Sequence, residues 1–94
     1  MTESIISNDR VCFRCGTTQN LHRHHLISGA FRSKSEQYGL WVYLCASCHV
    51  TGNEAVHSAK GIPYSNYLRK IAQERFEMVY GHDKWMKEFK RNWL

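Results

Sequence analysis

Two Cys-x-x-Cys pairs constrain this 94-residue chain more than any other feature. They consist of Cys12 with Cys15 and Cys45 with Cys48. Two such pairs can deliver four thiolates to one tetrahedral zinc ion, and Gly16 supplies the permissive backbone that a tight turn after the first pair favours. Four protein ligands leave no open position on the ion, so we predict a structural zinc site. The alternative is a core that contains four buried cysteines without a ligand role.

The setting of these cysteines also favours metal binding. The N-terminal stretch MTESIISNDR lacks the charged start and apolar run of a signal peptide, and no apolar run is long enough to span a bilayer. We therefore expect a cytoplasmic protein without a membrane partner, and paired thiols in a reducing compartment usually hold metal. A redox role is disfavoured because the βαβ pattern expected around such a motif is missing.

The length allows one small domain, because so short a chain cannot support two cores. We assign residues 1–94 to a single α+β domain, with a core over 11–57 and helices over 63–94. Within the core, residues 21–27 (LHRHHLI) and 40–45 (LWVYLC) predict an antiparallel β-hairpin. Its strands are joined by a long loop, SGAFRSKSEQYG.

Three helices are predicted after the second cysteine pair. The first covers residues 49–60 and is weakened by Gly52. Pro63 suits the first turn of a second helix, which Gly81 would terminate. A third runs over DKWMKEFKRNWL, with Asp83 as its cap. It could lie along DNA with its basic side chains, but we expect its apolar stripe to pack on the core, because large aromatic side chains need burial. The stripe consists of Trp85, Met86, Phe89 and Trp93.

Histidines are concentrated between and beside the cysteine pairs. The 29 residues between Cys15 and Cys45 exceed the ~15–20 of a simple zinc ribbon, so the zinc would clamp a hairpin that carries the histidines. Neighbouring strand residues face opposite sides, so His24 and His25 need different roles. One imidazole holding a cation and the next accepting a proton from water would suit phosphodiester hydrolysis. His22 and His24, which share a strand face, form a competing metal pair.

The helix predicted after Cys48 adds further candidate ligands. His49 begins its first turn, and Asn53 lies four residues on, above it on the same side. His57 is about 12 Å further along an unbroken helix. It could join the same ion only if the helix breaks, for example at Gly52, and could otherwise contact phosphate.

A net charge of +5 suggests a polyanionic partner, although the excess is spread along the chain. Arg23, Arg32 and Lys34 flank the histidines and could hold the phosphates of DNA. Solvated side chains without a ligand are an equal alternative for these three.

The segments CFRC, HRHHLI, YLCASCH and VH, which span about half of the chain, resemble the HNH endonucleases. This is the ββα-metal or His-Me finger group, and the likeness is closest to small phage and prophage members with a four-cysteine zinc. The resemblance implies that His24 binds the catalytic metal, His25 is the general base and His49 is the second ligand. It makes His57 an additional ligand or phosphate contact, and it implies a bacterial or phage-infected cell.

The resemblance implies a metal-dependent DNA endonuclease that leaves 5′-phosphate ends. The cation could be Mg²⁺, Mn²⁺, Ni²⁺ or a second Zn²⁺. One site per chain suggests nicking unless two copies assemble, so monomer and homodimer both stay open, as does double-strand cleavage. The alternative function is a zinc-stapled nucleic-acid or protein adaptor without cleavage. The family's central Asn, which restrains the hairpin loop, is absent, and the sequence has Leu40 instead. Ser35, Glu36 or the backbone near Gly39 could supply this restraint, and the alternative is an impaired site.

Overall fold

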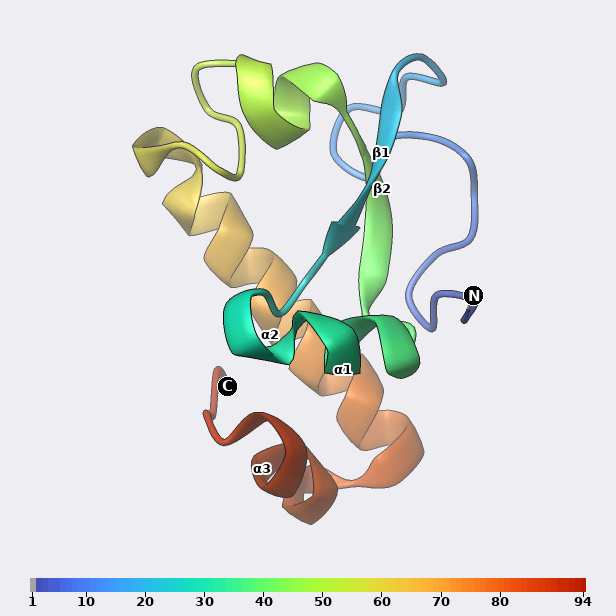
Figure 1. Cartoon of the computed structure of the whole chain (residues 1–94), viewed down its shortest axis with the longest axis vertical. Coiled ribbons are helices and arrows are strands. Elements are labelled where there is room, and N and C mark those ends of the chain that lie inside the picture. Colours follow the sequence, from blue (N-terminus) through green and yellow to red (C-terminus); the bar gives the residue numbers. More distant parts are fainter. Residues whose placement is uncertain (1) are drawn as a thin grey trace.

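A two-stranded antiparallel sheet forms the centre of the computed structural model, which describes residues 2–94. Strand β1 covers Leu21–His25 and strand β2 covers Trp41–Cys45, with Leu21 opposite Cys45 and His25 opposite Trp41. The predicted α+β class and hairpin are confirmed (Figure 1).

The connection between the strands is not the plain loop that we expected. It contains a 3₁₀ turn, η1, over Gly29–Phe31 and a helix, α1, over Arg32–Gln37. The helix is only six residues long and has no side-chain cap at its N-terminus. Neither the apolar periodicity nor the capping residues that identify a helix in a sequence are therefore present.

The helix predicted over 49–60 is also wrong. A single π-helical turn, η2, covers Ser47–Thr51, and Gly52 then adopts an extended conformation. A Cβ atom at Gly52 would lie 2.5 Å from the carbonyl oxygen of Ser47, so this close approach requires glycine. The chain leaves the turn here and reaches the 3₁₀ turn η3, Ala59–Gly61.

Two helices follow, as predicted, but the second is shorter than expected. Helix α2 covers Ile62–Tyr80, with proline in its first turn and Gly81 at its end. Helix α3 covers His82–Phe89 and stops at Lys90, which has a left-handed backbone. Asp83 lies in the first turn but does not cap the helix, because Gly81 occupies the cap position.

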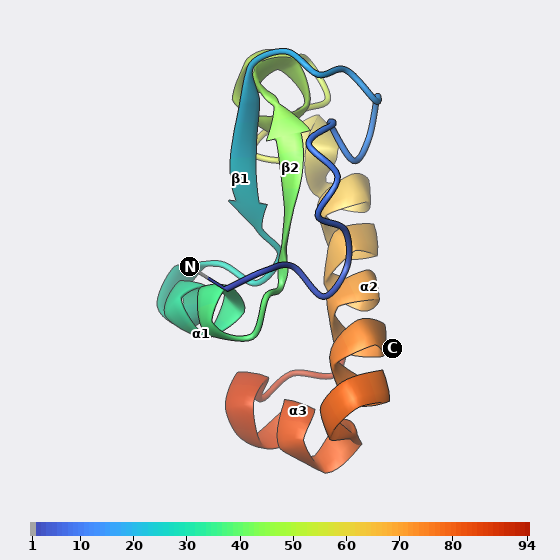
Figure 2. The same cartoon turned by 90° about the vertical axis from the view of Figure 1, so that its right-hand side faces the viewer.

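The core lies between the hairpin and these two helices. Figures 1 and 2 show α2 running along the hairpin and α3 packed against the far end of α2. The expected burial of the α3 stripe is confirmed for Trp85 and Phe89, while Met86 and Trp93 are partly buried against the same core. The large apolar side chains that are completely buried alongside Trp85 come from β2, the residue before it and α2: Leu40, Val42, Leu44, Leu68 and Phe76.

None of the helices within residues 2–94 combines the length and the apolar character needed to cross a membrane.

Candidate metal centres

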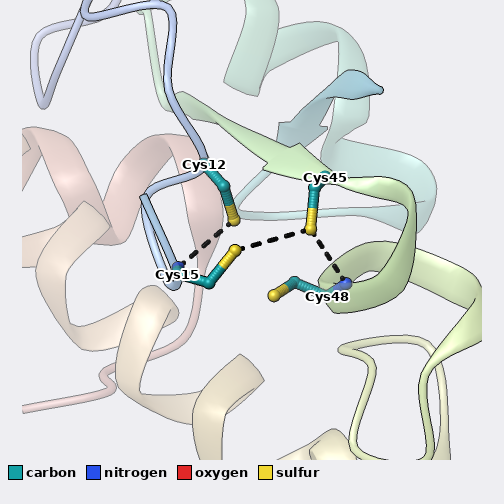
Figure 3. A group of neighbouring side chains, drawn as sticks. All are labelled: Cys12, Cys15, Cys45 and Cys48. Carbon is teal, nitrogen blue, oxygen red and sulfur yellow. Dashed lines mark hydrogen bonds between the residues drawn. The ribbon is translucent and has the colours of Figure 1, made fainter. Parts of the chain in front are cut away.

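The four cysteines gather at the end of the hairpin that lies away from α1 (Figures 1 and 3). Cys12 and Cys15 belong to the loop before β1, Cys45 ends β2, and Cys48 lies in η2. Their sulfurs lie within 4.8 Å of one another, and the Sγ atoms of Cys15 and Cys45 are 3.7 Å apart. Tetrahedral Zn–S bonds of about 2.3 Å place sulfurs about 3.8 Å apart. The cluster therefore fits a structural zinc site.

Each cysteine pair forms a tight turn that points backbone N–H groups at sulfur. The amide of Cys15 lies 3.4 Å from the Cys12 sulfur, and the amide of Cys48 lies 3.5 Å from the Cys45 sulfur. In the first turn, Gly16 has a φ of +82° and donates its N–H to the Cys12 carbonyl. The predicted need for glycine after Cys15 is therefore met by a left-handed backbone.

The electrostatics of the cluster favour a bound cation. Burial raises the pKa of Cys12, but hydrogen bonds from the backbone of Cys45, Cys15 and Arg14 outweigh it and lower that pKa to about 6. Burial and the neighbouring thiols raise the pKa of Cys48. Deprotonation of a second cysteine next to the first thiolate is thus opposed by repulsion between two negative charges. A divalent ion bound to both sulfurs removes this repulsion.

Three histidines form a second cluster on the other side of η2. His24 comes from β1, His49 from η2 and His57 from the segment after Gly52, and their ring nitrogens lie within 4.8 Å of one another. The Nε2 atoms of His49 and His57 are 2.9 Å apart. The break at Gly52 is the condition under which His57 could reach His49. Asn53 lines a different hollow, beside Cys15 and Cys48, and is not among the residues that line the histidine cavity.

Two imidazoles of this cluster, those of His24 and His49, are held in their neutral form, which is the form that binds metal. Burial, followed by the nearby His49 and His57, lowers the pKa of His24 to about 3. Burial, followed by the nearby His57 and His22, lowers the pKa of His49 to about 4. The imidazoles of His24 and His49 can therefore each offer a lone pair to one ion at neutral pH.

His22 lies at the edge of the cluster, not among its three members. Its Nδ1 atom is 3.0 Å from Nδ1 of His49, whereas His49 turns Nε2 towards His57. A hydrogen bond at one ring nitrogen fixes the tautomer and orientation of a histidine whose other nitrogen meets a ligand. The ring nitrogens that cluster are therefore those of His24, His49 and His57, and not those of the competing pair of His22 and His24.

His25 is not a member of the cluster of three histidines, in agreement with the different role expected for the neighbour of His24 in a strand. Its Nε2 atom lies 3.4 Å from Oε1 of Glu36. Arg23 donates to the same carboxylate, at 2.8 Å to Oε1 and at 2.9 Å to Oε2. Burial lowers the pKa of His25, and the hydrogen bond that its ring donates to Glu36 opposes part of that shift. His25 nevertheless lines the same cavity of about 190 Å³ as the three clustered histidines.

The three basic residues predicted to contact phosphate have different surroundings. Arg32 is exposed and lines the histidine cavity. Arg23 also lines it, but this side chain pairs with Glu36 and lies over the ring of Trp41. Lys34 bonds to the carboxylate and the carbonyl of Glu88 on α3. Phosphate contact stays a prediction for all three.

Ser35 restrains the loop that follows His25. Its buried hydroxyl accepts the N–H of Ile27 at 3.1 Å and donates to the carbonyl of the same residue at 2.7 Å. The Leu40 amide bonds to the carbonyl of Ser35, and the Leu40 carbonyl accepts the amide of Leu26. Of the candidates for this restraint, Ser35 thus makes the contacts to the loop, together with the backbone of Leu40.

Comparison of the chain with models of protein families finds no match, and comparisons with curated proteins and with solved structures find none either.

Proposed function

We propose that the chain is a metal-dependent DNA endonuclease of the HNH type, built on a zinc-stapled ββα-metal core. The observation that carries the proposal is one cavity lined both by three clustered histidines and by a fourth histidine outside the cluster. Three protein donors leave coordination positions open, which is typical of catalytic metal sites. The fourth histidine is then free to act on water.

His24, His49 and His57 are the residues that would hold the catalytic cation. When bound, such a cation stabilises the negative charge that develops on the phosphate and on the leaving oxygen. His22 contributes by orienting the ring of His49. Arg32, which has no carboxylate partner within residues 2–94, would bind the phosphate that flanks the scissile bond.

His25 would be the general base. A carboxylate only accepts hydrogen bonds, so contact with Glu36 keeps the hydrogen on Nε2 and leaves the lone pair on Nδ1. Nδ1 would take a proton from water while the water oxygen bonds to phosphorus. The P–O3′ bond then breaks, the 3′ oxygen is protonated by solvent, and the products carry a 5′-phosphate and a 3′-hydroxyl.

Nicking of supercoiled plasmid tests this proposal. Zinc-loaded wild type is assayed with Mg²⁺, Mn²⁺, Ni²⁺ or added Zn²⁺, next to His25→Ala and the matched control His82→Ala, which changes a histidine on α3 paired with Glu77. We expect His25→Ala to lose about 10²–10⁴-fold in rate, while His82→Ala nicks like wild type. Equal inactivity of wild type and His25→Ala with every cation would instead favour the adaptor function.

A further inference from the structure

A second hollow lies beside the histidine cavity and has no role in the proposed chemistry. Its volume is about 430 Å³, and Ser28 lines both spaces. Two arginines contribute to its wall, Arg69 from α2 and Arg91 from the segment after α3. Phe31 and Trp93 supply part of its apolar lining.

The fold fixes the backbone of Arg91 beside α2 through partly buried hydrogen bonds. The chain turns back after α3, so that its C-terminal end lies next to α2 (Figures 1 and 2). Gln73, fully buried on α2, accepts the N–H of Trp93 at 2.6 Å and donates to the Asn92 side chain at 2.7 Å. The indole N–H of buried Trp85 donates to the Arg91 carbonyl at 2.7 Å. Contacts with two core residues, Gln73 and Trp85, therefore fix the backbone position of the exposed residue Arg91.

The Trp93 ring contacts both guanidinium groups. Cζ of Arg91 lies 4.0 Å and Cζ of Arg69 lies 5.0 Å from the centre of its ring. Stacking on an aromatic ring orients a guanidinium without neutralising it. Arg69 donates one further hydrogen bond, to the Asn66 side-chain oxygen. Most of the N–H groups of both arginines thus stay free for a ligand.

The two positive charges have no acidic partner within residues 2–94, where each ion pair involves other residues. Burial and the nearby Arg91 lower the pKa of Arg69, which reflects the cost of holding the charges close together. An anion placed between them removes that cost. The planar fork of a guanidinium matches the oxygens of a phosphate group.

We propose that Arg69 and Arg91 bind one backbone phosphate of the DNA strand whose scissile bond lies at the histidine cavity. The inference rests on the proposed nuclease function and extends it to a second contact on the substrate strand. Shared lining by Ser28 makes the two spaces neighbours, so one strand can occupy both. Phosphate contacts of this kind position a strand without reading its sequence.

Binding of a fluorescein-labelled 20-bp duplex tests the site. Anisotropy is measured with zinc-loaded protein, without catalytic cation, at several salt concentrations. Arg69→Ala/Arg91→Ala is compared with Lys70→Ala/Arg75→Ala, which removes two exposed charges from α2. We expect the first pair to weaken binding about tenfold or more and to reduce the slope of log K against log salt by about one. The control pair should bind within about twofold of wild type.

Arg69→Lys/Arg91→Lys keeps both charges, removes the guanidinium fork and should bind with intermediate affinity. Zinc content and circular dichroism establish that each variant is folded. Equal affinities and equal salt slopes for the two alanine pairs would overturn the proposal. So would a loss of affinity for a polyglutamate peptide without a loss for the duplex, which would assign the hollow to an acidic protein.

Nicking separates failure of this site from failure of the nuclease proposal. If wild type nicks plasmid and both alanine pairs nick with unchanged KM and kcat, the phosphate site alone is overturned. If wild type does not nick with any cation but Arg69→Ala/Arg91→Ala loses duplex affinity, the phosphate site is supported and the nuclease proposal is overturned.

Discussion

The cysteine cluster and the histidine cluster use adjacent residues of one short turn, yet they offer different numbers of donors. Cys48 and His49 are neighbours in η2. One cluster collects four sulfurs, and the other collects three ring nitrogens at a cavity of about 190 Å³. Four donors complete a tetrahedral zinc site, whereas three leave room for water or substrate. The same turn therefore contributes one residue to a cluster of four donors and the next residue to a cluster of three donors.

The difference follows from where the remaining donors come from. Cys12 and Cys15 reach η2 from the N-terminal loop, so a bound ion would tie that loop to the end of the hairpin. His24 comes from β1, and His57 comes from the segment after Gly52. The backbone of η2 holds this segment through a hydrogen bond from the amide of His57 to the carbonyl of His49. The geometry of the histidine cluster thus depends on η2 and, through it, on the cysteine cluster.

Removing the structural zinc should have the largest effect. Because zinc binding is coupled to folding, we expect Cys45→Ser or chelation to destabilise the fold by on the order of 10 kcal/mol and to disperse the histidine cluster. Circular dichroism and urea unfolding with and without chelator measure the loss, and zinc readdition is the control for wild type. An unfolding midpoint that does not change on removal of zinc would contradict this dependence of one cluster on the other.

Removing a histidine donor should impair chemistry without loss of the fold. His49→Ala leaves two donors and should lower nicking by about 100-fold or more, because a bound cation contributes several kcal/mol of transition-state stabilisation. Isothermal titration with Mn²⁺ should show a matching loss of cation binding at unchanged zinc content. A variant that nicks at the wild-type rate would exclude His49 from the open site.

Ser35→Ala tests the restraint of the loop after His25. It leaves the N–H and carbonyl of Ile27 without their partner, and we expect a loss of about 2 kcal/mol in the free energy of unfolding. Urea denaturation measures this loss, and Ser33→Ala, an exposed position in the same helix, is the matched control. Equal stability of the two variants would show that the Ser35 hydroxyl does not restrain the loop.

His22→Ala should have the smallest effect of the four. Loss of the contact to Nδ1 of His49 frees that ring to rotate, and we expect cation affinity to fall by about tenfold. Titration with Mn²⁺ measures the change, and zinc content should stay at the wild-type level. A loss as large as that of His49→Ala would make His22 a ligand and the histidine cluster a four-donor site.

The parts of this arrangement that could be predicted from the sequence depend on short spacings. Paired cysteines and a strand of alternating faces are local patterns, so the cysteine cluster and the divergence of His24 from His25 follow from neighbouring residues. The turn at Gly52 could be predicted only as an option, because the close approach to the Ser47 carbonyl that requires glycine belongs to the folded backbone.

Other parts depend on contacts between residues far apart in the chain. Ser35 bonds to Ile27 from a helix too short to be recognised by periodicity. Arg91 reaches the neighbourhood of Arg69 because Lys90 turns the chain and Gln73 holds the segment that follows. The helical pattern over 83–94 predicts neither the turn of the chain at Lys90 nor the hydrogen bond between Trp93 and Gln73. The predicted helix was therefore too long.

Anomalous diffraction from crystals grown with Zn²⁺ and soaked in Mn²⁺ tests the contrast between a closed and an open centre most directly. We predict one zinc peak about 2.3 Å from the sulfurs of all four cysteines. A separate peak should lie among His24, His49 and His57, with solvent completing its coordination. Absence of metal from the histidines, or a fourth protein ligand closing that site, would contradict the account.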